Sequence, residues 1–169
     1  ATMMYGVGEV WEDRLEHLFK LRESQKRSLA RGAGHYTAFI AWSFQPLHTE
    51  MEGWGIELGT GMDYLRTTAL SRLILDNFEN IQVSYVTQGP KMAQVALTCG
   101  ANDFGSLMIE ENVVSAAGID FIMPEAEIRR LIEDAGFKPR RRFQDYAPAR
   151  ADETECPCCA WREPAVTTG

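Results

Sequence analysis

Cysteine is scarce in this sequence, and positive charge is the minority charge. The 169 residues include four cysteines, and 17 Lys and Arg stand against 24 Asp and Glu, which gives a net charge of −7. Three of the cysteines, Cys156, Cys158 and Cys159, lie too close together for an unstrained disulfide framework, which favours a reducing cytoplasm. The only basic cluster is residues 140–142, so the chain lacks the electrostatic signature of a nucleic-acid-binding protein.

Long apolar runs and metal-binding spacings are missing as well. No stretch approaches the roughly 20 apolar residues that a membrane-spanning helix needs, and no signal-peptide pattern precedes the first apolar run. The three histidines show neither HxH nor HExxH spacing, and the CPCC segment at residues 156–159 lacks both CxxC spacing and a fourth ligand. We therefore expect no membrane association and no metal site, with a zinc module formed by Cys156, Cys158 and Cys159 of the tail as the alternative.

The sequence does contain a regular alternation of short apolar runs and helical stripes. The runs predict strands at residues 1–5, 36–44, 81–86 and 103–109, and the last stripe predicts a helix from Pro124 to Ala135. Alternation of this kind is typical of α/β folds with parallel sheets, either open or closed into a barrel. A complete (β/α)₈ barrel needs about 250 residues, so we expect residues 1–146 to form half of one, as four parallel βα units.

The remaining residues, 147–169, are rich in Pro, Ala, Thr and charge without periodicity, and predict a flexible cysteine-containing tail. Half a barrel would also leave strand edges unpaired. We expect apolar residues of its inner face, such as Met3, Phe39, Val83 and Phe104 or their immediate strand neighbours, to meet water.

In parallel βα architectures the functional groups follow the C-terminal ends of the strands. The four predicted loops carry Tyr5, Gly6, Gly8 and Glu9; Phe44 and Gln45; Thr87 and Gln88; and Asn102, Asp103, Glu110, Glu111 and Asn112. The two glycines could bring backbone amides close to a carboxylate or phosphate, or serve only the geometry of the turn. The two glutamates could include a general base, or form a solvated pair. The amides Gln45, Gln88 and Asn112 suit the orientation of a polar substrate, or ordinary surface hydrogen bonding.

Several segments resemble a known family. The runs ATMMYG, EDRLEHL, FIAWSFQP, YLRTTALSRLILDN, VTQGPKMAQVAL, GANDFGSLMIEENVVSAAG and IRRLIEDAGF are similar to the C-terminal half of the radical S-adenosylmethionine enzymes of the menaquinone futalosine pathway. They extend from Ala1 to about Tyr146. Within that superfamily, residues 42–46, 86–89 and 110–112 look most like the cyclic dehypoxanthine futalosine synthases, with the aminofutalosine synthases and the deazaflavin-forming FO synthases as alternatives.

The resemblance implies a radical S-adenosylmethionine barrel with a [4Fe-4S] cluster on a CxxxCxxC loop, and that loop is absent from this sequence. It implies S-adenosylmethionine contacts at Tyr5, Gly6, Gly8 and Glu9, although Val7 stands where the family has His. It further implies dehypoxanthine futalosine as the substrate, bound near Phe44, Gln45, Thr87, Gln88, Asn102 and Asn112, with Glu110, Glu111 and Asp103 as catalytic candidates. We expect the chain alone to be inactive and to need a missing N-terminal half-barrel or self-association. The alternative is a non-catalytic half-barrel that binds a partner.

Overall fold

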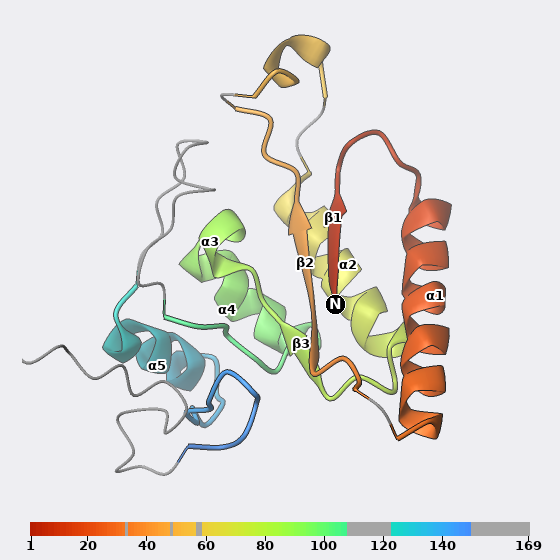
Figure 1. Cartoon of the computed structure of the whole chain (residues 1–169). Helices are drawn as coiled ribbons and strands as arrows, with labels where there is room; N and C mark the ends of the chain where they lie inside the picture. Colours follow the sequence, from red (N-terminus) through yellow and green to blue (C-terminus); the bar gives the residue numbers. More distant parts are fainter. Residues whose placement is uncertain (33, 48, 57–58, 108–122, 150–169) are drawn as a thin grey trace, which may run out of the picture. The chain divides into compact units, whose positions relative to one another are not determined.

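The computed structural model describes residues 1–32, 34–47, 49–56, 59–107 and 123–149. They form two compact units, Ala1–Lys138 and a second that begins at Pro139. The elements of the first unit are β1 (Thr2–Tyr5), α1 (Trp11–Ala30), β2 (Ala38–Ser43), the 3₁₀ helix η1 (Glu52–Trp54), α2 (Gly61–Ile74), β3 (Asn80–Gln82), α3 (Tyr85–Gln88), α4 (Pro90–Thr98) and α5 (Glu125–Asp134). Figure 1 shows the three strands side by side, with α1 following β1.

The sheet is parallel throughout, with its strands in the order β1-β2-β3. The register sets Tyr5 opposite Ser43 and Ile40 opposite Gln82. The predicted α/β class with a parallel sheet is therefore confirmed. The predicted fourth strand is reduced to one parallel bridge, between Gln82 and Asp103; residues 104–107 form no strand, and 108–109 lie outside the described residues.

The third strand is shorter than the sequence predicts. Strand β3 ends at Gln82, and the chain turns at Ser84 into α3, where the amide of Gln88 donates to the carbonyl of Ser84 over 3.0 Å. Tyr85 and Val86 are buried within this single turn of helix. A short apolar run has the same appearance in a buried strand and in a buried helical turn, which explains why the pattern alone mistook this segment for strand.

Local signals place the helices well. Thr60 and Asp63 form a reciprocal capping box at the start of α2: the hydroxyl of Thr60 accepts from the amide of Asp63, whose carboxylate accepts from the amide of Thr60, both over 3.2 Å. Pro90 is the first residue of α4, a position that suits proline, and α5 lies within one residue of its predicted bounds at each end.

The two faces of the sheet differ in burial. Met3, Phe39, Ala41 and Ile81 lie in the hydrophobic core, where α2 packs against β2 and β3. On the other face Thr2 and Met4 are exposed, and Ile40, Trp42 and Gln82 are only partly buried. Met3, Phe39, Val83 and Phe104, which we expected to meet water either themselves or through their immediate strand neighbours, are all buried. The apolar exposure falls on their neighbours, most clearly on Met4, which is 50% exposed.

In the second unit, residues 139–149 form a small antiparallel bridge between Arg142 and Pro148. The guanidinium of Arg142 lies 4.0 Å from the centre of the Tyr146 ring. Across the part of the chain that is described, no helix is both long enough and apolar enough to cross a bilayer.

Candidate functional site

The C-terminal ends of β1 and β2 lie together, and polar side chains gather there. Tyr5 and Ser43 end the two strands in register, and the amide of Phe44 continues the ladder with a 2.7 Å hydrogen bond to the carbonyl of Tyr5. Because parallel strands of a sheet end at the same edge, the loops after β1 and β2 open on one side of the molecule, as the sequence predicts.

A partly open cavity of about 250 Å³, called here the Ser43 pocket, lies at this edge. Its lining residues are Ser43, Gln45, Gly59, Gly61, Thr87, Gln88 and Met92. None of these side chains carries a charge. Drug-sized ligands occupy roughly 300–1,000 Å³, so the pocket is large enough for one part of such a ligand, such as a sugar, rather than for the whole molecule.

Hydrogen bonds organise the polar wall of the pocket around Ser43. Its hydroxyl accepts from the side-chain amides of Gln88, over 2.7 Å, and Gln45, over 3.0 Å. The hydroxyl of Thr87 lies 2.7 Å from that of Ser84, at the start of α3. Each glutamine thus donates an amide N–H to Ser43, and this hydrogen bond orients its carboxamide group. A wall of hydroxyl and carboxamide groups can donate to and accept from a neutral polar ligand.

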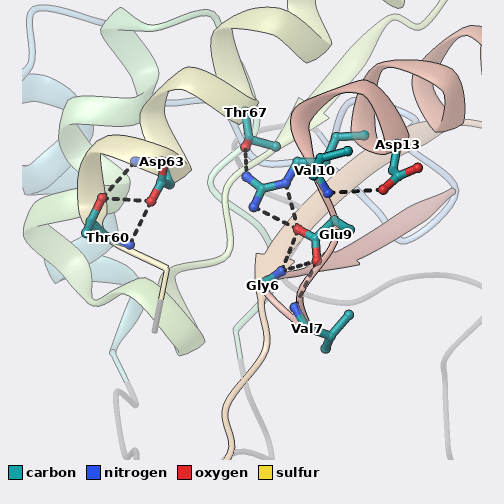
Figure 2. Close-up of polar contacts among 9 residues, drawn as sticks. Gly6, Val7, Glu9, Val10, Asp13, Thr60, Asp63 and Thr67 are labelled. Carbon is teal, nitrogen blue, oxygen red and sulfur yellow. Dashed lines mark hydrogen bonds and ion pairs between the residues drawn. The ribbon is translucent and has the colours of Figure 1, made fainter. Parts of the chain in front are cut away.

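The second part of the site is the Gly6 loop, residues 6–9, which follows β1. Gly6 has a φ of 90°, a conformation that other residues rarely adopt. The Glu9 carboxylate closes the loop by accepting from the amides of Gly6, over 2.7 and 2.9 Å, and Val7, over 2.8 Å (Figure 2). The amides of Gly6 and Val7, which could otherwise bind an anionic ligand, are therefore already occupied by a carboxylate of the chain itself.

Arg14 holds this carboxylate from the other side. Its Nε and Nη2 atoms each lie 2.7 Å from Oε1 of Glu9, and its Nη1 donates to the hydroxyl of Thr67 on α2 over 3.4 Å. The guanidinium also lies over the rings of Tyr5 and Trp11, 4.4 and 4.6 Å from their centres. The Gly6 loop, α1 and α2 are thereby joined through one side chain.

Burial and hydrogen bonding shift three pKa values around this loop. Burial acts to raise the pKa of Glu9, but hydrogen bonds from the Gly6 and Val7 amides and from Arg14 outweigh it, so the pKa lies below its ordinary value. Burial also raises the pKa of Tyr5, with a further contribution from Tyr64. Burial likewise raises the pKa of Tyr64 to about 12, against a hydrogen bond from the Ser84 amide. Both tyrosines are therefore neutral hydroxyl groups at physiological pH.

The structure places the predicted site residues in several different positions. Gln45, Thr87 and Gln88 line the Ser43 pocket. Tyr5 ends β1, and Gly6 and Glu9 belong to the Gly6 loop that follows it, whose Gly8 is exposed. Phe44 is partly buried beside the pocket without lining it. Glu110, Glu111 and Asn112 lie outside the described residues.

Asn102 and Asp103 lie elsewhere on the sheet. Asp103 bridges to Gln82, which pairs with Ile40, which pairs with Thr2. This row lies three residues, or roughly 10 Å, before the row of Tyr5 and Ser43. The side chain of Asn102 accepts from the Ile81 amide and from Arg72, over 2.8 and 2.7 Å, and the Asp103 carboxylate accepts from the Gly105 amide. Both side chains therefore stabilise the chain at the start of the predicted fourth strand, and neither lines the Ser43 pocket.

Sequence reasoning missed four residues that build the site: Arg14, Ser43, Thr67 and Met92. Ser43 stood next to two residues that were identified, and the alternation of β2 would have placed it on the same face as Ala41. Arg14 stood in the first turn of a predicted helix, five residues after Glu9. Thr67 and Met92 join the site only through tertiary packing, for which a single sequence carries no local signal.

Comparison with known proteins identifies the family of the chain. Residues 33–154 match the family model described as the CofH/MqnC C-terminal region. The chain is 44% identical over 153 residues to a cyclic dehypoxanthine futalosine synthase of Halalkalibacterium halodurans, a match that covers 90% of this chain and 40% of the relative. It is 40% identical over 146 residues to a protein of the same name from Streptomyces coelicolor, covering 86% of this chain and 35% of the relative.

A second kind of enzyme also matches. The chain is 37% identical over 157 residues to a 5-amino-6-(D-ribitylamino)uracil–L-tyrosine 4-hydroxyphenyl transferase of Methanococcoides burtonii, covering 89% of this chain and 43% of the relative. The chain thus spans about two fifths of the length of the curated relatives that it matches.

Proposed function

Because the chain belongs to the family of the CofH/MqnC C-terminal region, we propose that it forms one wall of the ligand cavity in a radical S-adenosylmethionine enzyme. The proposed reaction is that of the cyclic dehypoxanthine futalosine synthases, to which the chain is 44% identical. The described sheet would be part of a half-barrel of four βα units, and its partly exposed face, with Met4, Ile40 and Trp42, would line the barrel interior. The observation that carries the proposal is the uncharged polar Ser43 pocket at the C-terminal edge of a parallel sheet.

The described residues do not fit the [4Fe-4S] cluster that the family implies. They include one cysteine, Cys99, which is a free thiol, and no group of three His, Cys, Asp or Glu side chains that could hold a metal ion. A cluster of this kind is held by several thiolates. The role of the described residues is therefore binding and orientation.

The Ser43 pocket fits the sugar part of a ligand. A ribose presents several hydroxyl groups, each of which can both donate and accept, and no charge. The carboxamides of Gln45 and Gln88 and the hydroxyl of Thr87 offer the complementary neutral groups. Bound S-adenosylmethionine supplies the radical chemistry in such enzymes. The reacting carbon of the substrate must then be held in position, and hydrogen bonds from these carboxamide and hydroxyl groups can hold it.

Restoring the substrate's aromatic ring after cyclisation releases one electron, which the family's [4Fe-4S] cluster would accept, and one proton, which needs a basic acceptor. We assign the role of proton acceptor to Glu110 or Glu111, the carboxylates that follow the predicted fourth strand in the sequence. In a full-length relative with the same Glu-Glu-Asn segment, Glu→Gln at the acceptor position should lower cyclised product roughly 10²- to 10⁴-fold while cleavage of S-adenosylmethionine continues. Near-normal product from both variants would remove both glutamates from the mechanism.

The methanogen relatives favour a second candidate function. They are named for a 4-hydroxyphenyl transfer between tyrosine and 5-amino-6-(D-ribitylamino)uracil. A ribityl chain also presents neutral hydroxyl groups, so the pocket chemistry suits either substrate. The two functions differ in which substrate supports turnover.

One experiment tests the function directly. The chain is co-expressed with the segment of the Halalkalibacterium halodurans relative that lies outside the match, reconstituted anaerobically with iron and sulfide, and given S-adenosylmethionine with either substrate. We expect 5′-deoxyadenosine and cyclised product from dehypoxanthine futalosine only when both pieces are present, and neither product from the chain alone. Turnover of tyrosine with the ribitylaminouracil instead would establish the second function. No turnover of either substrate, with a full-length relative active in parallel, would refute both.

A further inference from the structure

The Arg14 guanidinium contacts four side chains. It reaches the Glu9 carboxylate through two nitrogen atoms and Thr67 through the third, and it lies over the rings of Tyr5 and Trp11. The Arg14 side chain is 12% exposed and that of Glu9 is 17% exposed. An ion pair that is shielded from water to this extent is worth more than an exposed one, because solvent screens it less.

The Glu9 carboxylate transmits this anchoring to the Gly6 loop. One of its oxygens contacts Arg14, and both of its oxygens accept hydrogen bonds from the backbone amides of Gly6 and Val7 (Figure 2). The loop contains Gly6 and Gly8, both at positive φ, and glycine brings high conformational freedom to an unanchored chain. The conformation of the Gly6 loop therefore depends on the Glu9 carboxylate, and the position of that carboxylate depends on Arg14.

We propose that Arg14 is a positioning residue: it fixes Glu9 across the amides of Gly6 and Val7 and so sets the shape of the Gly6 loop for an uncharged part of the ligand. The inference rests on the proposed function, because it takes the end of β1 as part of the ligand cavity. It also argues against anion binding by the Gly6 and Val7 amides, which is the function that glycines suggest in such a loop. With both amides bound to Glu9, the loop cannot offer them to a phosphate or a carboxylate.

Lysine cannot replace arginine in this arrangement. The planar guanidinium reaches Glu9 and Thr67 with separate nitrogen atoms and lies over two aromatic rings, whereas an ammonium is a single point charge. Arg14→Lys therefore keeps the charge and removes the geometry. Glu9→Gln keeps the size and removes the charge.

The matched control lies on the same helix. Arg22 makes a two-pronged ion pair with Asp76, over 2.7 and 2.8 Å, and both side chains are well exposed. Arg22→Lys therefore also replaces a guanidinium that contacts a carboxylate through two nitrogen atoms, two turns further along α1 and away from the Gly6 loop. A general weakening of α1 would appear in both variants, and an effect on the loop only in Arg14→Lys.

The first measurement is amide hydrogen exchange of the whole chain, read by mass spectrometry on the peptide that contains Gly6 and Val7. A charged hydrogen bond is worth about 1.5–3 kcal/mol, so we expect exchange at these amides to be roughly tenfold faster or more in Arg14→Lys and in Glu9→Gln. In Arg22→Lys it should match the wild type. Wild-type exchange at this loop in Arg14→Lys would overturn the proposal.

The second measurement separates the proposal from the function on which it rests. In a full-length relative with the same Gly-x-Gly-Glu segment and the arginine five residues later, the Arg→Lys variant should raise KM for S-adenosylmethionine or substrate at least fivefold and leave kcat within twofold. Added guanidinium should restore KM in the Arg→Ala variant, because the carboxylate and the two rings that the arginine contacts remain. If the loop exchanges faster and both KM values are unchanged, the positioning of Glu9 by Arg14 stands and the place of this loop in the ligand cavity is refuted.

Discussion

The side-chain amide of Gln88 donates a 2.7 Å hydrogen bond to the hydroxyl of Ser43, which joins α3 to the last residue of β2. The two residues are far apart in the chain, and Ser43 is only 4% exposed. This contact aligns the third βα unit with the second at the edge where the pocket lies. The shape of the pocket therefore depends on it.

The coupling between Ser43 and Gln88 is measurable in a double-mutant cycle. Ser43→Ala, Gln88→Ala and the double variant should show a coupling free energy of about 1 kcal/mol in urea unfolding, the usual net value of such a hydrogen bond. Gln94→Ala is the control, because Gln94 donates instead to the carbonyl of Leu131. Its effect should add to that of Ser43→Ala without coupling. Full additivity for Ser43 and Gln88 would show that their contact does not stabilise the fold.

The two buried tyrosines of the core should respond oppositely to loss of their hydroxyl groups. The hydroxyl of Tyr5 has no hydrogen-bond partner among the described residues, whereas that of Tyr64 accepts from the Ser84 amide over 2.9 Å. We expect Tyr5→Phe to raise the free energy of unfolding by about 1 kcal/mol, because an unsatisfied buried group is removed. Tyr64→Phe should lower it by about 1–3 kcal/mol, since a buried N–H loses its partner. Chemical denaturation decides, and a clear loss of stability in Tyr5→Phe contradicts the prediction.

Glu9 should make the stability of the chain dependent on pH. Its folded-state pKa lies below the ordinary value of 4.5, so its contribution is complete above pH 4.5 and is lost as the pH falls through the lowered folded-state value. The difference in free energy of unfolding between wild type and Glu9→Gln should therefore be greatest near neutral pH and shrink in acid. Unfolding curves at pH 7, 5, 4 and 3 test this. A difference that is constant over this range would show that the Glu9 charge does not stabilise the fold.

The partly exposed face of the sheet should make the isolated chain self-associate. Met4 is 50% exposed beside the partly buried Trp42, its register partner on β2. We expect Met4→Glu to shift the chain toward monomer in size-exclusion chromatography with light scattering and to lower its binding of a hydrophobic dye. Leu73→Glu is the control, because Leu73 is 75% exposed but lies on α2 rather than on the sheet. A wild-type chain that is monomeric and silent to the dye contradicts the prediction.

The sequence predicted the elements whose signals are local. The helical stripe that predicts α5 acts within a few residues, and the structure places this helix within one residue of its predicted bounds at each end. The end of β3 was mistaken because buried Tyr85 and Val86 look the same in a strand and in a helical turn.

The site was predicted in part for a related reason. The rule that loops follow strands found Gln45, Thr87 and Gln88, because each follows or ends an apolar run. The same rule placed Asn102 and Asp103 at the pocket, whereas the register sets Asp103 beside Gln82, opposite the first half of β1. Register depends on which residues pair across the sheet, and the spacing of apolar residues in one segment does not contain that information.

In the sheet β1-β2-β3 the order in space is the order of synthesis. Thr2 pairs with Ile40, and Ile40 pairs with Gln82. Each strand can therefore form its hydrogen bonds only after the roughly 40 residues up to its partner position have been translated. At 5–20 residues per second, that interval is roughly 2 to 8 s for each pairing on the ribosome. For that time the growing chain has a bare strand edge and the side chain of Met4 in contact with whatever is nearby. We therefore expect ribosome-associated chaperones to bind the nascent chain in the interval between the synthesis of one strand and the synthesis of the next.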